Sequence, residues 1–291
     1  MQVTVKAPAK INLVLQITGK LDNGYHTLSM IMQAVSLYDT VSVAACKEKG
    51  ISVSCNHPNV PCNDKNIVYK AAVAFFESNS IMDYGIHINI DKQIPTEAGL
   101  AGGSTDGAAV LIALNTLYNT GLSLQELAEI GAKIGTDIPF CLFGGSMLIG
   151  GVGTELTKIQ DMPDCQILIA KPNVSVSTKE AYSLSDAHGF SDNKETIRAL
   201  QAFSDGNLRE ITNSMVNDFE KVMALKEVEK TRDIMNQNGA LGSRMTGSGS
   251  AVFGIFEKDS DAHAALNILK TMYQDVFLCT PLKYGCKIIT E

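Results

Sequence analysis

The sequence predicts an α+β fold arranged in two lobes. Three observations support this prediction: the chain has 291 residues, both halves mix strand and helix patterns, and no Pro- or Ser-rich linker separates them. A length near two ordinary domains is compatible with two lobes or with one large α/β unit. From the placement of the motifs described below, we expect a first lobe over residues 1–155 and a second over residues 156–291.

Strand and helix patterns account for most of the chain. Alternating or β-branched apolar residues predict strands at residues 2–18, 28–46, 86–90 and 166–171, with further strands near the C-terminus. Apolar residues at helical spacing predict helices at residues 66–77, 105–118, 193–203, 226–237 and 260–273. Gly24 marks the turn between the first two strands. Ser123 with Glu126, and Ser177 with Glu180, form capping boxes that predict two more helix starts.

The composition is typical of a folded protein, with 45% hydrophobic and 19% charged residues. A net charge of −7, without any Lys/Arg-rich block, makes nucleic acid and anionic membrane surfaces poor partners. The sequence has no signal-peptide core and no stretch that reads as a membrane span, so we expect a cytoplasmic protein. The seven cysteines lack metal-ligand spacing, which favours reduced thiols. For the oligomeric state, the sequence is compatible with either a monomer or a homodimer.

A glycine-rich segment, residues 95–106 with the sequence PTEAGLAGGSTD, follows the strand at 86–90 and precedes a helix. Glycines let the backbone approach a ligand closely, and the helix directs the positive end of its dipole at the same point. The segment therefore predicts a polyphosphate site, to which Ser104 and Thr105 add hydroxyls for phosphate or magnesium. A plain glycine-rich turn that caps a helix is an equally compatible alternative.

Three motifs resemble those of the GHMP kinases, a family named for galactokinase, homoserine kinase, mevalonate kinase and phosphomevalonate kinase. They are KAPAKINL at residues 6–13, the glycine-rich segment at 95–106 and RMTGSGS at 244–250, in the family's order. The resemblance implies an N-terminal lobe like ribosomal protein S5 domain 2 and a ferredoxin-like C-terminal lobe. It also implies transfer of a phosphoryl group from ATP, with Mg²⁺, to a small molecule. The missing Walker A and strand-linked G-x-G-x-x-G motifs disfavour P-loop kinases and dinucleotide enzymes.

Asp137 and Lys10 are the candidate catalytic residues. Phosphoryl transfer needs a carboxylate that orients the attacking hydroxyl and accepts its proton, and Asp137 stands between a glycine and the apolar run at 138–140. An ammonium beside Asp137 would keep the carboxylate ionised and offset charge on the transferred group, which is the role we assign to Lys10. The alternatives are a helix or turn cap for Asp137 and a solvated strand residue for Lys10.

The surroundings of the nucleotide follow from the family resemblance. It implies that Asn66, Ile67 and Lys92 lie around the adenine and that the glycine-rich loop contacts the phosphates. The loop residues are Pro95, Thr96, Glu97, Ala98, Gly99, Leu100, Ala101, Gly102, Gly103, Ser104 and Thr105. A second loop, Thr246-Gly247-Ser248-Gly249, is expected to support the first, and a plain turn before a strand is its alternative.

Other segments resemble the family members that act on a cytidyl diphosphate substrate. These are Gly24-Tyr25-His26 after the first strand and GTDIPF at residues 135–140. The resemblance implies that the Tyr25 ring stacks on the cytosine and that His26 hydrogen-bonds to it, with Tyr182 on the other face. Without the family resemblance, Tyr25 and His26 would be interpreted as an aromatic pair at the tip of a surface hairpin. The implied substrate residues are Asn12, Tyr25, His26, Thr178 and Tyr182.

The glycine-rich loop departs from the family pattern. Small or apolar residues are usual where Thr96 and Glu97 stand, and an alanine is common where Gly107 stands. Because Glu97 brings negative charge near a polyphosphate, we expect it to point to solvent or to meet Lys92. Two rival functions stay open: another GHMP kinase of the homoserine or mevalonate type, and a module that binds ATP without transferring phosphate. The intact candidate catalytic residues argue against the second.

Overall fold

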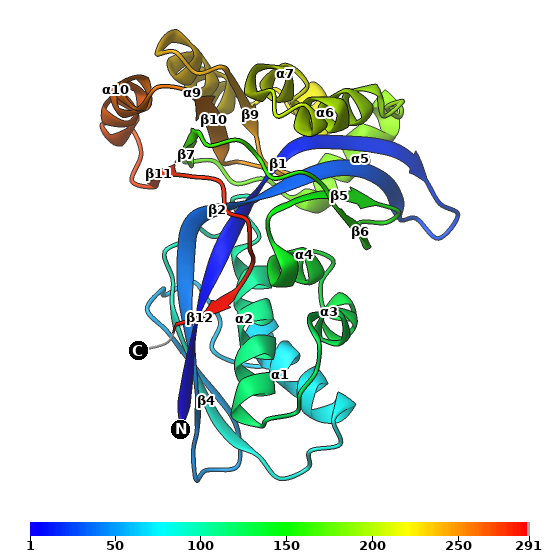
Figure 1. Cartoon of the computed structure of the whole chain (residues 1–291), viewed down its shortest axis with the longest axis vertical. Helices are drawn as coiled ribbons and strands as arrows, with labels where there is room; N and C mark the ends of the chain where they lie inside the picture. The colour runs from blue at the N-terminus through cyan, green and yellow to red at the C-terminus, as the bar shows by residue number, and fades with distance from the viewer. Residues whose placement is uncertain (290–291) are drawn as a thin grey trace.

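The computed structural model describes residues 1–289 and confirms a two-lobed α+β fold. Figure 1 shows the lobes joined by two long strands, β1 (Gln2–Lys20) and β2 (His26–Ala45), which run from one lobe into the other. The two strands pair antiparallel from Gln2 opposite Ala44 to Lys20 opposite His26, as predicted for the opening of the chain. Gly24 has a φ of +85° in the turn between them.

The first sheet is built around β1 and β2. Its strand order is β12-β1-β2-β4-β3. The edge strands are β3 (Gly50–Cys55) and β12 (Lys287–Ile288), and β4 (Gly85–Asp91) lies between β2 and β3. Three more strands attach to it: β5 (Ser146–Gly150), β6 (Glu155–Lys158) and β8 (Val216–Asn217). The register of β1 against β2 shifts after Pro8, Asn12 and Ile17. Such bulges bend a strand pair, here where it passes between the lobes.

Four helices cover one face of this sheet in Figure 1: α1 (Ile67–Ser78), α2 (Gly102–Leu117), α3 (Leu124–Ala132) and α4 (Ile138–Phe143). Helix α2 is central, because it contacts β1, β2 and the other three helices. Asn66 caps α1 by accepting a hydrogen bond from the Val68 N–H, and Ser123 with Glu126 forms the predicted capping box. Helix α2 begins earlier than predicted, since the glycine-rich segment itself enters the helix at Gly102.

The second lobe has a four-stranded antiparallel sheet in the order β11-β7-β10-β9. Its strands are β7 (Gln166–Ala170), β9 (Gly242–Met245), β10 (Val252–Phe256) and β11 (Val276–Cys279). The helices of this lobe are α5 (Thr178–His188), α6 (Lys194–Ser204), α7 (Leu208–Asn213), α8 (Asp218–Val222), α9 (Lys226–Gln237) and α10 (Asp259–Lys270). Helices α6, α9 and α10 confirm the predicted segments. At α5, Ser177 accepts the Glu180 N–H, but the reciprocal bond is missing among the described residues.

The division of the chain near residue 155 stays a prediction. Residue 155 is the first residue of β6, which pairs with β5 in the first sheet. The end of the chain crosses back from the second lobe, since β12 pairs with β1 at Val5 and Lys6. Just before β12, the Cys286 N–H donates to the Cys141 carbonyl of α4 at 2.9 Å. The C-terminal segment therefore packs behind the helices that carry the glycine-rich loop and Asp137.

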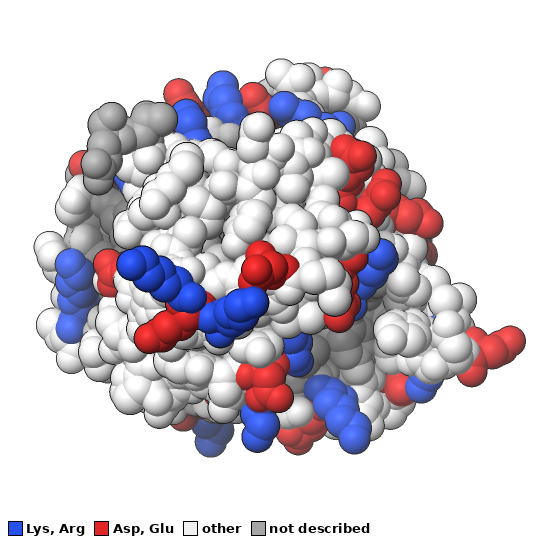
Figure 2. Space-filling model, turned by 90° about the horizontal axis from the view of Figure 1, so that it is seen from below, with Lys and Arg blue, Asp and Glu red and all other residues white. Residues whose placement is uncertain are grey.

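Figure 2 shows Lys, Arg, Asp and Glu side chains interspersed on one face of the molecule, without a continuous positive area on that face. Among residues 1–289, none of the helices combines the length and the apolar character that a membrane crossing requires.

Candidate active site

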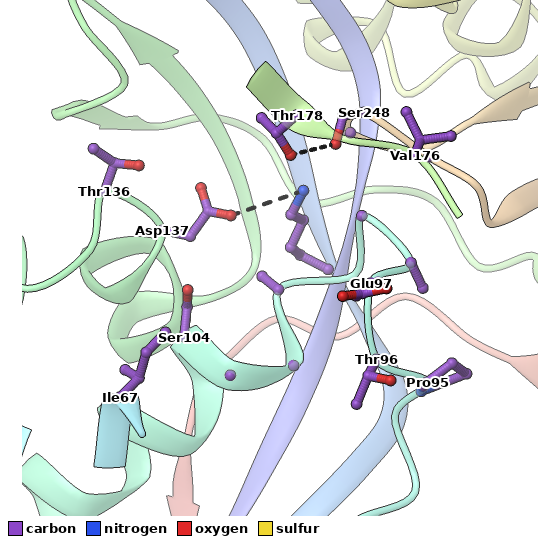
Figure 3. A pocket seen from close by; sticks show the side chains of 18 of the residues that line it. Ile67, Pro95, Thr96, Glu97, Ser104, Thr136, Asp137, Val176, Thr178 and Ser248 are labelled. Carbon is purple, nitrogen blue, oxygen red and sulfur yellow. Dashed lines mark hydrogen bonds and ion pairs between the residues drawn. The ribbon is translucent and has the colours of Figure 1, made fainter. Parts of the chain in front are cut away.

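A cavity of about 1390 Å³ brings the sequence motifs together. Its walls come from β1 and β2, the loop between β4 and α2, the start of α4, residues 175–182 and the loop at 247–249. Figure 3 shows Ile67, Pro95 and Thr96 toward one end of this space, with Thr178 and Ser248 toward the other. Motifs that lie far apart along the chain thus face a single volume, which is large enough for a nucleotide and a second molecule.

The loop between β4 and α2 forms a cradle for an anion. Gly99 and Ala101 have φ values of +74° and +57°, so the backbone curls inward just before the helix. Ala101 is the N-cap of α2 and provides no side-chain hydrogen bond, which leaves the N–H groups of the first turn for a ligand. With the helix dipole behind them, these N–H groups favour a phosphate. The Ser104 side chain also lines the cavity.

The loop at 246–249 packs against the glycine-rich loop and stabilises the cradle. The Thr246 hydroxyl donates to the Gly99 carbonyl at 3.2 Å and accepts the Asn12 N–H at 3.0 Å, so it ties the glycine-rich loop to β1. Asn217 stabilises the same loop, because its Nδ2 donates to the Met245 and Gly247 carbonyls, each at 2.8 Å. Thr246 is fully buried and acts through these bonds, whereas Gly247, Ser248 and Gly249 line the cavity.

Lys10 and Asp137 lie close together in the wall of the cavity. The Lys10 Nζ lies 3.9 Å from Asp137 Oδ2 and donates to Asn12 Oδ1 at 2.6 Å. Burial lowers the pKa of Lys10, and the charge of Asp137 partly offsets this by raising it. Asp137 holds the N-cap position of α4 but makes no capping bond with its side chain. Its carboxylate instead points into the cavity, as Figure 3 shows.

Three of the predicted substrate residues line the cavity: Asn12, Thr178 and Tyr182. The Thr178 Oγ1 lies 2.8 Å from the Ser248 Oγ, and Figure 3 shows this pair above Asp137. The Tyr182 ring packs edge-on against Phe219 at 5.0 Å between centroids. This end of the cavity therefore offers hydroxyls beside an aromatic wall.

The structure does not bring Tyr25 and His26 to the cavity wall. The Tyr25 side chain is 62% exposed at the hairpin tip. The His26 ring stacks on Tyr182 with 4.6 Å between centroids, and its Nε2 lies 2.6 Å from Asp186 Oδ1. The His26 ring therefore already has a stacking partner, Tyr182, and a hydrogen-bond partner, Asp186. The contacts of Tyr25 and His26 with a cytosine stay predictions.

Most of the predicted nucleotide residues line the cavity, and two do not. Leu100 and Thr105 have side chains that are 1% and 0% exposed. The Thr105 hydroxyl lies 3.5 Å from the Cys286 sulfur and not at the cavity wall, so its contact with phosphate or magnesium stays a prediction. Asn66 lines the cavity, but its side chain caps α1 and donates to the Pro61 carbonyl at 2.6 Å.

Of the two outcomes expected for Glu97, the structure has the first, because Glu97 is exposed to solvent and does not meet Lys92. Lys92 is buried and instead pairs with two other carboxylates, Asp39 and Asp106. Glu97 has a φ of +52° and lines the cavity without an ion pair among the described residues. The third departure, Gly107, has a packing reason, because a Cβ there would lie 2.8 Å from the Ile67 side chain on α1.

Several residues of the cavity wall were not anticipated from the sequence. Most of them belong to two groups. An apolar wall is formed by Leu15, Leu28, Met30, Met32 and Phe219, and the loop before Asn66 contributes Asn59, Val60, Pro61 and Lys65. The methionines alternate along β2 as core residues would, so nothing in the pattern marks them as ligand contacts. Asp106 had a signal, since it is the last residue of the glycine-rich segment at 95–106.

Two family models match the chain. The GHMP kinases N terminal domain matches residues 66–145 and the GHMP kinases C terminal model matches residues 197–275. A 4-diphosphocytidyl-2-C-methyl-D-erythritol kinase of Caldicellulosiruptor saccharolyticus is 43% identical, covering 95% of this chain and 96% of the relative. The chain belongs to the GHMP kinase family. It is therefore an ATP-dependent kinase of small molecules.

Other comparisons agree with this assignment. A Clostridium botulinum relative, also a 4-diphosphocytidyl-2-C-methyl-D-erythritol kinase, is 42% identical, with 94% of this chain and 98% of the relative covered. A crystal structure of 4-(cytidine 5'-diphospho)-2C-methyl-D-erythritol kinase superposes with a TM-score of 0.81 at 29% identity, covering 97% and 99% of the two chains. Homoserine kinase from Cytophaga hutchinsonii has a TM-score of 0.81 at 19% identity, covers 99% of this chain and 97% of its own, and supports the fold.

In this GHMP kinase, we expect Gly99→Ala to raise the KM for ATP at least about tenfold and to lower the melting temperature. A Cβ at Gly99 would lie 2.0 Å from the Thr246 carbonyl oxygen, and its φ of +74° is strained for alanine. The two loops must therefore separate, which displaces the cradle. Steady-state kinetics and thermal unfolding measure both effects.

Gly121→Ala is the matched control for this substitution. Gly121 has a similar φ of +69°, but a Cβ there meets no atom within 4 Å. It should lower stability by about 1 kcal/mol and leave the KM for ATP unchanged. An unchanged KM in Gly99→Ala would show that the contact between the two loops does not shape the nucleotide site.

Proposed function

We propose that this kinase transfers the γ-phosphoryl group of ATP to the 2-hydroxyl of 4-diphosphocytidyl-2-C-methyl-D-erythritol, a step of non-mevalonate isoprenoid precursor synthesis. One observation carries the proposal: a cradle of backbone N–H groups at the start of α2 opens into the same cavity as the Lys10–Asp137 pair. The names of the relatives that match nearly the whole chain supply the acceptor.

In the proposed reaction, Asp137 accepts the proton of the acceptor hydroxyl as its oxygen attacks the γ-phosphorus. The new O–P bond forms while the bond from the γ-phosphorus to the β,γ-bridging oxygen breaks, and ADP leaves with that electron pair. Lys10 lies 3.9 Å from Asp137 and is held by Asn12, so its ammonium can offset charge on the transferring group. The low exposure of Lys10, 4%, strengthens this interaction by excluding water.

Magnesium fits this site mainly as part of the nucleotide complex. Residues 1–289 contain no group of three His, Cys, Asp or Glu residues that could hold a metal ion. The hydroxyl of Ser104, in the first turn of α2, is an oxygen donor that suits Mg²⁺ and lines the cavity. We therefore propose Ser104 as the protein contact of an ion held otherwise by phosphates. When bound, Mg²⁺ neutralises negative charge on the β- and γ-phosphates.

The acceptor is proposed to lie at the end of the cavity lined by Thr178 and Tyr182. Its cytosine would meet Tyr25, His26 and Tyr182, which requires the His26–Tyr182 stack to open or the base to approach from the hairpin side. The proposed working form is a cytoplasmic monomer or homodimer that has neither nucleic acid nor membrane as a partner.

An assay of ADP release with three acceptors tests the proposal. We expect rapid turnover with 4-diphosphocytidyl-2-C-methyl-D-erythritol and at least about a hundredfold lower kcat/KM with homoserine or mevalonate, because only the first offers a base to the aromatic end. A preference for homoserine or mevalonate would replace the proposed acceptor with that of another family member. ATP binding without turnover of any acceptor would favour the non-catalytic rival.

A further inference from the structure

Asn217 is a buried asparagine at the junction where β8 ends and α8 begins. Strand β8 pairs parallel with β1, and this pairing places Asn217 opposite Leu15. Asn217 is only 1% exposed and does not line the cavity. Phe219, two residues later, does line the cavity and packs against Tyr182 at its acceptor end. A buried amide therefore lies next to the wall of the proposed active site.

The Asn217 amide acts both as a donor and as an acceptor. Its Nδ2 donates to the carbonyls of Met245 and Gly247, each at 2.8 Å. Its Oδ1 accepts the Phe219 N–H at 3.0 Å and so caps α8. A carboxylate could accept the capping bond, but it could donate to neither carbonyl. The contacts at this position therefore require an amide side chain.

The two carbonyls that Asn217 holds lie on either side of Thr246 along the chain. The Thr246 hydroxyl donates to the Gly99 carbonyl at 3.2 Å and accepts the Asn12 N–H at 3.0 Å. Because the main chain is held before and after Thr246, the direction of this hydroxyl is fixed. Asn217 therefore determines how the second loop meets the glycine-rich loop and β1.

Two parts of the proposed active site depend on Thr246. The first is the phosphate cradle, which includes Gly99. The second is the Lys10 ammonium, since Asn12 Oδ1 accepts a hydrogen bond from Lys10 Nζ at 2.6 Å. One chain of contacts thus runs from Asn217 through Thr246 to Gly99. A second chain continues from Thr246 through Asn12 to Lys10.

We propose that Asn217 is a positioning residue for phosphoryl transfer, whose amide orients Thr246 and thereby places both the phosphate cradle and the Lys10 ammonium. The contacts that lead to Gly99 act on ATP binding. The contacts that lead to Lys10 act on the chemical step. This proposal rests on the proposed function, because it takes Lys10 to act on the transferring group, but it does not depend on the identity of the acceptor.

Asn217→Asp tests the proposal, because it keeps the volume of the side chain and an oxygen that can cap α8. It replaces the two N–H donors by an oxygen that faces two carbonyls, and even a protonated carboxyl group donates only once. We expect kcat to fall at least about tenfold, since displacing a group at the reacting centre by about 1 Å can cost about a hundredfold. The KM for ATP should rise at least about threefold, whereas the KM for the acceptor should change less than about twofold.

Thr231→Val is the matched control for lost stability. Thr231 is fully buried on α9 and does not line the cavity. Its hydroxyl contacts the Glu227 carbonyl at 2.7 Å and the Tyr273 hydroxyl at 3.0 Å. The variant loses buried hydrogen bonds, so it should lower the melting temperature and leave kcat and both KM values unchanged. Equal kinetic losses in Thr231→Val and Asn217→Asp would overturn the proposal, because stability alone would then explain them.

Combining Asn217→Asp with Lys10→Met tests the contacts that lead to Lys10. If Asn217 acts on the chemical step through the ammonium, its loss has no further effect once the ammonium is gone. The double variant should therefore have the kcat of Lys10→Met within about threefold. Two losses that multiply would overturn the proposal, because independent effects of the two substitutions behave in that way.

Asn217→Ser takes the place of Asn217→Asp if circular dichroism shows that the aspartate variant does not fold. A serine oxygen still caps α8 without burying a charge, and a single hydroxyl cannot donate to both carbonyls. The same losses in kcat and in ATP affinity are expected. A folded Asn217 variant with the kcat and the KM for ATP of wild type would overturn the proposal.

The rates are measured with whichever of the three acceptors wild type turns over fastest. A preference for homoserine or mevalonate would correct the proposed function and leave this test intact. If wild type turns over none of the three, the proposed function fails, and the Kd for ATP from isothermal titration calorimetry decides the role of Asn217. Weaker ATP binding by Asn217→Asp but not by Thr231→Val would support the proposal, and equal Kd values in wild type and Asn217→Asp would overturn it.

Discussion

Replacing Asp137 by Asn is expected to lower kcat on the order of 10³-fold while the KM for ATP changes less than about threefold. The asparagine oxygen can still accept a hydrogen bond from the acceptor hydroxyl, but it cannot take up the proton, and general-base catalysis is worth about 10²- to 10⁴-fold. Folding should be retained, because the Asp137 side chain makes no capping bond and asparagine is an equally good N-cap. Single-turnover and steady-state kinetics measure the effect.

Asp83→Asn is the control for this substitution, since Asp83 is an exposed aspartate that does not line the cavity. It should match wild type in kcat and KM. Equal single-turnover rates for wild type and Asp137→Asn would remove Asp137 as the base. A raised KM for ATP with unchanged kcat would instead indicate that Asp137 acts in nucleotide binding.

Replacing Lys10 by Met is expected to lower kcat by about 10²- to 10³-fold, the usual cost of removing one preorganised charge from the transition state. Methionine suits a side-chain site that is only 5% exposed, so most of the effect should come from the lost charge. Lys6→Met is the matched control, because Lys6 lies on the same strand, β1, with an exposed side chain. Similar losses in both variants would show that the effect does not come from the cavity.

The pH dependence of kcat gives a second readout for Lys10. Burial lowers the pKa of Lys10, so the ammonium loses its proton at a lower pH than an exposed lysine would, and kcat should fall on the alkaline side. Asp137 raises the pKa of Lys10 through its charge. In Asp137→Asn this support is lost, and the alkaline limb of the residual activity should therefore shift to lower pH. A limb that stays in place would contradict the Lys10–Asp137 coupling.

The parts of the fold that could be predicted are those with strong local signals. Helix α1 follows from apolar spacing with Asn66 as its cap, and α3 from the Ser123–Glu126 capping box. The short elements β8 and β12, of two residues each, have no local pattern and form only because β1 offers a partner. The return of the C-terminal segment to the first sheet is therefore a tertiary effect.

The candidate site shows the same division. The glycines of the two loops could be predicted as close-approach positions, and Gly99 indeed packs against the Thr246 carbonyl. The ion pair between Lys92 and Asp39 could not be predicted, because Asp39 lies on another strand and no local sequence pattern links the two residues. The engagement of His26 by Asp186 likewise joins residues from the hairpin and α5. Contacts between distant segments depend on packing, which a single sequence does not encode locally.

A crystal structure of the kinase with a non-hydrolysable ATP analogue and its acceptor tests the central claim most directly. We expect the terminal phosphate within hydrogen-bonding distance of both the Lys10 ammonium and the N–H groups at the start of α2, with the acceptor hydroxyl against the Asp137 carboxylate. A nucleotide whose terminal phosphate lies away from these three segments would contradict the account.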